Sequence, residues 1–137
     1  MEEALIQAAK SGVDVKLILP HIPDKWYAFA LARSYYKSLL SAGVKIYEYT
    51  PGFVHAKIFV ADDSTAVVST INLDFRSLYH HFECGVYLHQ TEAIAAIELD
   101  YQKTLEDCQP VTLESLRSVN KLQLLMGRLL RIISPIL

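Results

Sequence analysis

Two segments with helical periodicity, each ended by a glycine and followed directly by an apolar strand, constrain the fold of this chain most strongly. Residues 2–11 favour a helix, and residues 13–19 follow as an alternating and then wholly apolar strand. Residues 26–42 have helical periodicity again, and residues 44–49 form the next strand. Alternating helices and strands predict an α/β fold with a central mixed β-sheet and helices on both faces.

Composition limits the class of protein. With 137 residues, of which 52% are hydrophobic, the chain suits one globular domain with a genuine core. A net charge of -2 gives no bulk attraction to nucleic acid or to an anionic membrane. Cys84 and Cys108 lack metal-site spacing and indicate neither a disulfide framework nor zinc. We find no apolar run long enough for a membrane span and no signal peptide, which favours material on the cytosolic side.

An extended apolar stretch carries His55 and Lys57 two residues apart, so that both side chains project from one face of a strand. The turn-forming residues 62–64 predict an antiparallel hairpin with the strand that follows. Equal counting along the two arms brings Ser69 beside Lys57, and Ile71 and Asn72 beside His55. The two polar clusters therefore form one predicted site.

These residue types indicate phosphodiester chemistry. A neutral imidazole such as His55 can attack phosphorus and form a phosphohistidine. Lys57, with the amide of Asn72 and the hydroxyl of Thr70, can hold the developing oxygen charge without a metal. A second histidine must protonate the leaving alkoxide, and the hairpin supplies only one.

The remainder of the chain continues the α/β pattern. Residues 72–80 read as a polar loop and 82–89 as a further strand. Residues 92–108 favour a helix that Pro110 interrupts, and a last helical stretch runs over residues 112–133.

The site residues resemble the HKD motif of the phospholipase D superfamily: His55-x-Lys57, then Asp62, then Ser69-Thr70-x-Asn72. Residues 47–53, 72–77 and 82–83 are more narrowly similar to bacterial cardiolipin synthases. Family members usually have Gly where this chain has Ser69, which is still a small residue. Cardiolipin synthases commonly have Asn where this chain has His81.

The resemblance implies a phospholipase D/nuclease-like α/β/α sandwich. It implies one HKD-motif domain over residues 1–137, similar to the second, C-terminal half of a two-motif enzyme, with residues 112–137 as a helical extension. The implied catalytic residues are His55, Lys57 and Asp62, the implied phosphate ligands are Lys57, Thr70 and Asn72, and the residue that orients an imidazole is Glu83. Asp62 lies at the predicted turn, so a structural role there is an equal alternative.

The implied activity is transfer of a phosphatidyl group between phosphatidylglycerol molecules through a phosphohistidine, without metal or cofactor. His55 would act as nucleophile or as general acid, and a second HKD domain, in a longer chain or as a homodimer mate, would supply the other group. The isolated chain is then inactive unless it pairs. A longer enzyme would be anchored to the inner membrane, with this domain peripheral on the cytoplasmic side. The alternatives are a dimeric phospholipase D-like phosphodiesterase or nuclease, and an inactive half-domain for dimerisation or membrane binding; a nucleic-acid partner is not favoured.

Other features allow simpler interpretations. Aromatic residues at helical spacing usually lie in the core or at its rim, although they could also line a lipid-binding entrance. Here these residues are Trp26, Tyr27, Tyr35 and Tyr36. The remaining histidines lack ligand spacing, so we expect no metal; these are His21, His80, His81 and His89.

The last helix is amphipathic and basic. Its apolar face contains Leu122, Leu125, Met126, Leu129, Ile132 and Ile133, and its basic side contains Arg117, Lys121, Arg128 and Arg131. Docking on an anionic membrane surface through residues 117–133, and packing against another domain or a dimer mate, are both consistent with this pattern.

Overall fold

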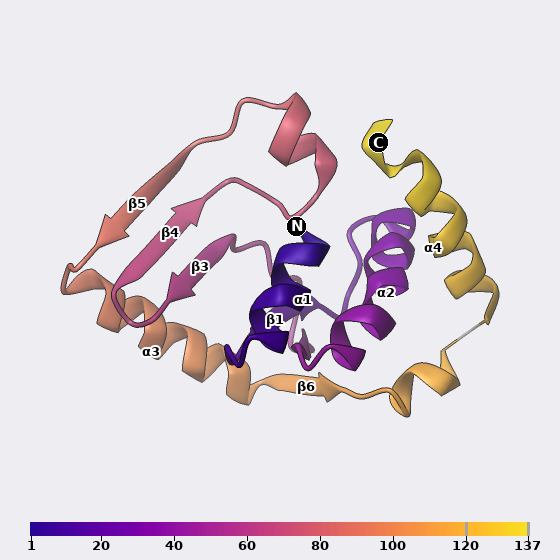
Figure 1. Cartoon of the computed structure of the whole chain (residues 1–137), viewed down its shortest axis with the longest axis horizontal. Coiled ribbons are helices and arrows are strands. Elements are labelled where there is room, and N and C mark those ends of the chain that lie inside the picture. Colours follow the sequence, from indigo (N-terminus) through magenta and orange to yellow (C-terminus); the bar gives the residue numbers. More distant parts are fainter. Residues whose placement is uncertain (120, 137) are drawn as a thin grey trace. The chain divides into compact units, whose positions relative to one another are not determined.

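The computed structural model describes residues 1–119 and 121–136, and the chain divides into two compact units (Figure 1). The first unit is built from Met1–Val54 and Cys108–Pro135, and the second from His55–Asp107. The first contains α1 (Glu2–Lys10), β1 (Lys16–Pro20), α2 (Trp26–Ser41), β2 (Lys45–Tyr49), β6 (Cys108–Val111), a 3-10 turn (Ser115–Ser118) and α4 (Lys121–Ile133). The second contains β3 (Ile58–Ala61), β4 (Thr65–Ser69), a π-helical turn (Arg76–His80), β5 (Gly85–His89) and α3 (Ala93–Glu106). A further 3-10 turn spans Ser134–Ile136.

The first unit has a mixed sheet in the order β1-β2-β6. β1 and β2 run parallel, with Leu17 opposite Ile46, because α2 carries the chain back between them. β6 lies antiparallel to β2, with Val111 opposite Ile46. The α/β class and the mixed sheet predicted from the sequence are confirmed.

The core of the first unit lies between α2 and β2. Four side chains with at most 5% exposure form it: Tyr36, Leu39, Val44 and Ile46. Leu5 of α1 and Val111 of β6 pack against their edges. Each fully buried large apolar side chain contributes about 1.5–3 kcal/mol, so this cluster is the main source of stability in the unit.

A charged cluster also lies inside the first unit. Glu48, only 4% exposed, accepts two hydrogen bonds of 2.9 Å from Nη2 of Arg33, one to each of its carboxylate oxygens. Nδ1 of His21 lies 2.7 Å from Oε2 of the same carboxylate. The guanidinium of Arg33 also stacks 4.4 Å from the ring centre of Phe29. A carboxylate removed from water is costly unless it is paired, and these contacts provide that pairing.

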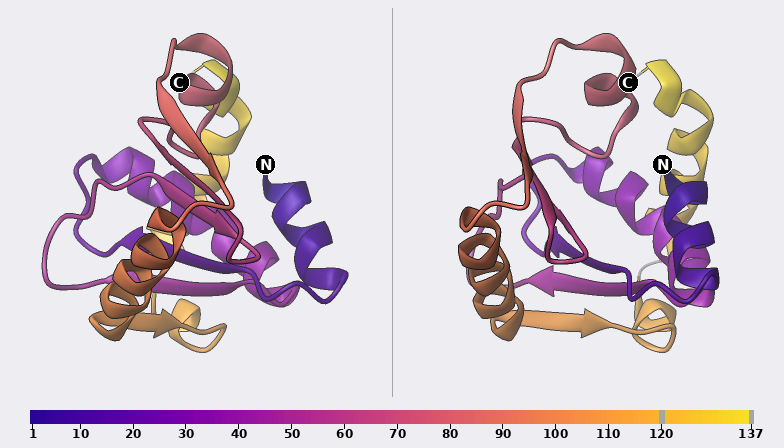
Figure 2. Two further views of the ribbon diagram at one scale, coloured as in Figure 1. Left: turned by 90° about the vertical axis from the view of Figure 1, so that its left-hand side faces the viewer. Right: turned by 60° about the vertical axis from the view of Figure 1, so that its left-hand side comes forward.

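The second unit has an antiparallel sheet in the order β3-β4-β5. Figure 1 shows the three strands side by side, and the views of Figure 2 show the same sheet nearly edge-on. α3 packs on this sheet, where Ile94 of the helix and Ala66 of β4 are each 1% exposed. This sheet carries the candidate site residues at the ends of its strands.

The strands differ from the prediction in two respects. The sequence predicts one central sheet, whereas the described strands form two sheets of three strands each. Residues 108–111, predicted as a helix end interrupted by Pro110, form β6. Pro110 is tolerated because β6 is an edge strand, where a missing N–H leaves no ladder partner unsatisfied.

The predicted helix over residues 112–133 is shorter in the structure. A 3-10 turn covers Ser115–Ser118, and the amphipathic helix itself begins at Lys121 and ends at Ile133. Asn120 lies outside the described residues. Among the described residues, no helix is long and apolar enough to cross a membrane.

Candidate active site

The hairpin of β3 and β4 has the register that the sequence predicts. Ile58 lies opposite Val68, and the backbone N–H of Ser69 donates a 3.0 Å hydrogen bond to the carbonyl oxygen of Lys57. Continued by two residues, this register sets Ile71 opposite His55. His55 itself lies just before β3, in an extended segment without regular pairing.

The turn of the hairpin is formed by Asp62, Asp63 and Ser64. Both aspartates have a φ of 52°, the left-handed conformation that Asp tolerates better than most residues. The Ser64 N–H closes the turn on the Ala61 carbonyl oxygen at 3.2 Å. All of β3, about 13 Å at 3.3 Å per residue, separates this turn from Lys57. The structure thus brings Lys57 and Ser69 together and leaves Asp62 at the opposite end.

Lys57 is tied to its own segment. Its Nζ donates a 2.6 Å hydrogen bond to the backbone carbonyl oxygen of His55. An ammonium has three donors, so this contact fixes the side chain and leaves two N–H groups for an anion. His55 itself is exposed to solvent.

Thr70 joins the end of β4 to the start of β5. Its backbone N–H donates to the Cys84 carbonyl oxygen at 2.9 Å. Its hydroxyl donates to Oε2 of Glu83 at 2.5 Å and accepts the Cys84 N–H at 3.1 Å. Because the single hydroxyl proton is directed at Glu83, Thr70 would have to release Glu83 before it could donate to a phosphate oxygen.

Glu83 is held in its charged form. Hydrogen bonds from Thr70 and then from Ser77 lower the pKa of its carboxyl group below the usual value, and the electrostatic effects of His81 and Lys57 act in the same direction. The carboxylate is therefore ionised at neutral pH, and in that form it accepts hydrogen bonds only. Sequence reasoning identified Glu83 but missed Ser77, which is 8% exposed.

The segment after β4, predicted as a loop, contains the π-helical turn Arg76–His80. Oδ1 of Asp74 accepts the Ser77 N–H at 2.8 Å, which is the hydrogen bond of a helix N-cap. An Asp three residues before a Ser was the signal that could have found this turn. Asn72 lies exposed between β4 and the turn.

His81 closes the same turn. Its backbone N–H donates to the Arg76 carbonyl oxygen at 2.9 Å, and Nε of Arg76 donates to its Nε2 at 2.7 Å. The His81 side chain therefore serves as a hydrogen-bond acceptor for Arg76.

Gly85 of β5 makes room for the unusual Ser69. The two residues are paired across β4 and β5, and a Cβ on Gly85 would lie 2.8 Å from the Cβ of Ser69. Real Cβ atoms do not approach so closely, so the missing side chain of Gly85 accommodates the serine. The Ser69 hydroxyl accepts the Ile71 N–H at 3.2 Å and thereby stabilises the bend that leads to Asn72.

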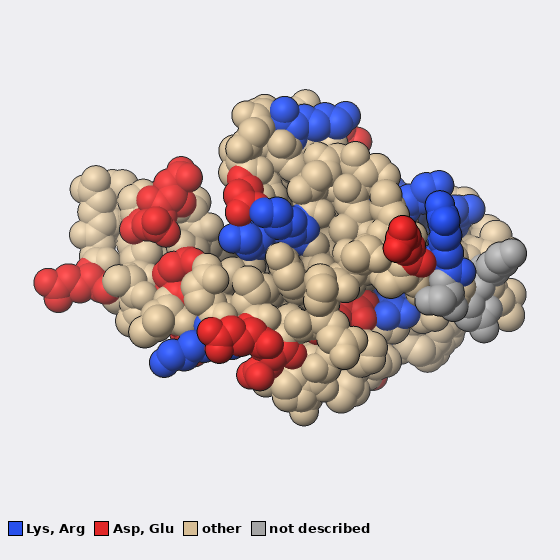
Figure 3. Space-filling model, turned by 90° about the horizontal axis from the view of Figure 1, so that it is seen from below, with Lys and Arg blue, Asp and Glu red and all other residues tan. Residues whose placement is uncertain are grey.

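The described residues give no sign of a metal centre or of a broad basic surface. Within residues 1–119 and 121–136, no three His, Cys, Asp or Glu side chains are grouped to hold a metal ion. Neither Cys84 nor Cys108 forms a disulfide. On the face shown in Figure 3, acidic and basic side chains are interspersed.

The fold places the chain in a known class. It is similar to the phospholipase D family member Nuc of Salmonella typhimurium, with a TM-score of 0.69 and 19% identity, over 80% of this chain and 72% of that one. This similarity shows that the two chains share a fold.

Sequence comparison is more specific. The family model described as "Cardiolipin synthase, PLD-like domain" matches residues 1–105, and the chain belongs to this family. It is 42% identical over its whole length to a cardiolipin synthase of Clostridium perfringens and 38% identical over 98% of its length to one of Halalkalibacterium halodurans. It is 54% identical to an uncharacterised protein of Streptococcus mutans. The chain spans less than a third of the length of each of these relatives.

Proposed function

We propose that this chain is one half of a phosphatidyltransferase of the cardiolipin synthase type. The observation that supports this best is the convergence of Lys57, Thr70, Ser77 and Glu83 at the paired ends of β3, β4 and β5, next to an exposed His55. The family match and the cardiolipin synthase relatives favour a phospholipid over other phosphodiesters. The proposed substrates are two phosphatidylglycerol molecules, and the products are cardiolipin and glycerol.

The proposed reaction has two displacements at phosphorus. In the first, a histidine nitrogen forms a P–N bond, the P–O bond to one glycerol breaks, and a general acid gives that oxygen its proton. In the second, the hydroxyl of another phosphatidylglycerol attacks, the P–N bond breaks, and the same group takes the hydroxyl proton back. His55 is one of the two histidines, as nucleophile or as general acid.

Lys57 and Asn72 are the proposed phosphate ligands. The ammonium of Lys57 keeps two donors after its bond to the His55 carbonyl oxygen, and the Asn72 amide is exposed on the adjoining segment. Donors placed before the reaction stabilise the charge that develops on the non-bridging oxygens. Thr70 joins them only if its hydroxyl leaves Glu83.

Glu83 is the proposed orienting residue. A fixed carboxylate stabilises an imidazolium and selects its tautomer, as in other histidine-carboxylate pairs. Thr70 and Ser77 hold that carboxylate, and their hydrogen bonds keep it charged. Asp62, at the far turn with a positive φ, is proposed to shape the hairpin and to have no part in the chemistry.

The complete site requires a second HKD domain. The hairpin contributes one histidine, and two displacements need a nucleophile and a proton donor. The chain is therefore proposed to be a single HKD-motif domain, equivalent to the C-terminal half of a two-motif enzyme, and to be inactive until it pairs within a longer chain or as a homodimer. Its proposed location is the cytoplasmic side of the inner membrane, with an anionic membrane surface as a further partner of residues 117–133.

The test is product analysis with a paired domain. The chain is co-expressed with an N-terminal HKD half of a related cardiolipin synthase and supplied with phosphatidylglycerol. Cardiolipin and glycerol in equal amounts support transfer. Phosphatidic acid without cardiolipin would identify a hydrolase, and cleavage of a simple phosphodiester by the chain alone would identify a self-paired phosphodiesterase. Absence of any product from the paired protein would favour an inactive binding module.

A further inference from the structure

α4 packs on α2 through its smallest residue. Gly127 is buried, and a Cβ there would lie 2.2 Å from the Ala30 carbonyl oxygen and 3.1 Å from the Cβ of Ser34. Only glycine permits this approach of the two helices. The contact side of α4 is therefore centred on Gly127.

Polar groups on the same side of α4 complete the contact. Nη2 of Arg131 donates a 2.8 Å hydrogen bond to Oε2 of Glu2 of α1, and its guanidinium lies 4.0 Å from the ring centre of Tyr35. Ser134, about two turns further along from Gly127 and just after the end of α4, is 5% exposed. The side of α4 that contains Gly127, Arg131 and the following Ser134 thus faces its own unit.

The apolar side of α4 is left open. Its side chains are between 37% and 76% exposed; they are Leu122, Leu125, Met126, Leu129, Ile132 and Ile133. An amphipathic helix of a globular protein ordinarily buries this side, and apolar patches beyond a few hundred Å² usually mark an interaction surface. We call these six residues, together with Trp26, the apolar docking face.

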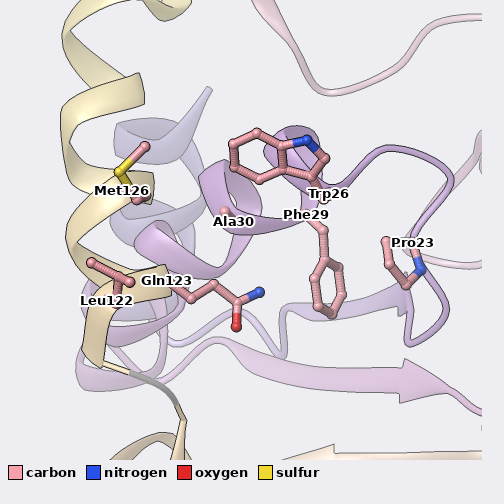
Figure 4. A pocket seen from close by; sticks show the side chains of 7 residues that line it. All are labelled: Pro23, Trp26, Phe29, Ala30, Leu122, Gln123 and Met126. Carbon is pink, nitrogen blue, oxygen red and sulfur yellow. The ribbon is translucent and has the colours of Figure 1, made fainter.

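Trp26 extends this face onto α2. It is 63% exposed and borders a cavity of about 440 Å³ (Figure 4). Trp26 and Phe29 line the cavity from α2, and Leu122 and Met126 line it from α4. An exposed tryptophan beside an apolar groove is typical of a surface that enters the headgroup region of a bilayer.

Charge indicates which partner covers the apolar docking face. Residues 117–137 include four basic residues and no acidic ones, although the whole chain has a net charge of -2. Arg128 is exposed and borders the apolar side of α4, from where a long side chain reaches an anionic headgroup while its stem lies on apolar surface. Arg131 is already engaged with Glu2 and is not counted.

We propose that the apolar docking face lies in the surface of an anionic lipid bilayer, with α4 parallel to the membrane plane. Apolar side chains enter the interface, and Arg128 and Arg117 contact anionic headgroups. This deepens the proposed function, because it names the membrane that presents the phospholipid substrate. It concerns binding alone and can be tested without catalysis.

Trp26 is the only tryptophan of the chain, so its fluorescence reports on this face directly. The 137-residue chain is titrated with vesicles of phosphatidylglycerol and phosphatidylcholine, and separately with phosphatidylcholine alone. The anionic vesicles should shift Trp26 emission to the blue and allow quenching by brominated lipid. Leu125→Glu with Leu129→Glu should weaken binding at least about tenfold, because both side chains lose their apolar contact with lipid.

Two matched variants control the experiment. Leu99→Glu introduces one glutamate at an apolar residue of α3 that is 57% exposed, and it should bind as wild type does. Arg128→Glu should weaken binding to anionic vesicles by about fivefold or more, without changing the weak binding to neutral ones.

Several results would overturn the proposal. One is an unchanged Trp26 emission with anionic vesicles, and another is equal loss of binding in Leu99→Glu. A third is a vesicle-free dimer in sedimentation analysis that Leu125→Glu with Leu129→Glu converts to a monomer, since a second copy would then cover the face. Vesicle binding without cardiolipin formation by the paired protein would refute the proposed function and leave the docking face standing.

Discussion

Replacing Arg33 by Met should destabilise the first unit strongly, because it leaves the buried Glu48 carboxylate short of its main partner. The Glu48 side chain is 6% exposed and that of Arg33 is 17% exposed, and Arg33 donates three hydrogen bonds of 2.9–3.1 Å to the carboxylate. Removing one member of a buried pair costs about 3–5 kcal/mol. His21 remains at 2.7 Å and is 46% exposed, which reduces the expected loss to about 3 kcal/mol, the lower end of that range.

Urea unfolding followed by circular dichroism measures this loss. Arg33→Met with Glu48→Leu removes both charges, and it should be more stable than Arg33→Met alone because no unpaired carboxylate remains. Arg128→Met removes an exposed arginine and should change the free energy of unfolding by less than about 0.5 kcal/mol. A loss of unfolding free energy below about 1 kcal/mol in Arg33→Met would refute this reasoning. So would a double variant whose loss equals the sum of the losses in Arg33→Met and Glu48→Leu measured separately.

Two further predictions concern the second unit. Hydrogen bonding by Thr70 lowers the pKa of Glu83 below 4.5 in the folded state, so the stabilising contribution of Glu83 is complete above that pH and is lost as pH falls through the lowered folded value. The urea midpoint should therefore fall less steeply from neutral to acidic pH in Thr70→Val than in wild type. An unchanged dependence of the midpoint on acidic pH would contradict this. Gly85→Ala should destabilise by about 1–3 kcal/mol because its Cβ meets Ser69, and Ser69→Gly in the same chain should restore most of the loss. Gly52→Ala, with open space around it, is the matched control; an equal loss there would rule out the proposed contact.

The hairpin could be predicted from the sequence because its determinants are local. Two consecutive aspartates adopt the left-handed turn, and strand alternation then fixes Lys57 opposite Ser69. The helix ends were predictable for the same reason, since Gly12 and Gly43 have φ values of 93° and 96°.

The misread elements depend on tertiary context. Pro110 reads as a helix breaker, and only its place at a sheet edge makes a strand possible. The Glu83 environment combines Thr70, thirteen residues earlier, with Ser77 from a turn that was read as loop. Sequence spacing alone does not bring these hydroxyls to one carboxylate.

The orientation of α4 could not be predicted from the sequence either. A helical wheel identifies its apolar side, and apolar sides normally face the core. The structure shows the reverse, because Gly127 allows a closer approach to Ala30 than any larger residue would. Which side of α4 packs on its own unit therefore depends on a backbone contact that hydropathy does not report.

The central claim is that His55 is one of the two histidines of a paired active site. The most direct measurement is the rate of cardiolipin formation by the chain paired with an N-terminal HKD half, for His55→Ala and for His89→Ala, an exposed histidine on β5. Loss of a group that makes or protonates the bond at phosphorus should lower the rate by about 10⁴-fold or more, while His89→Ala retains the wild-type rate. A His55→Ala rate within about tenfold of wild type would contradict the claim.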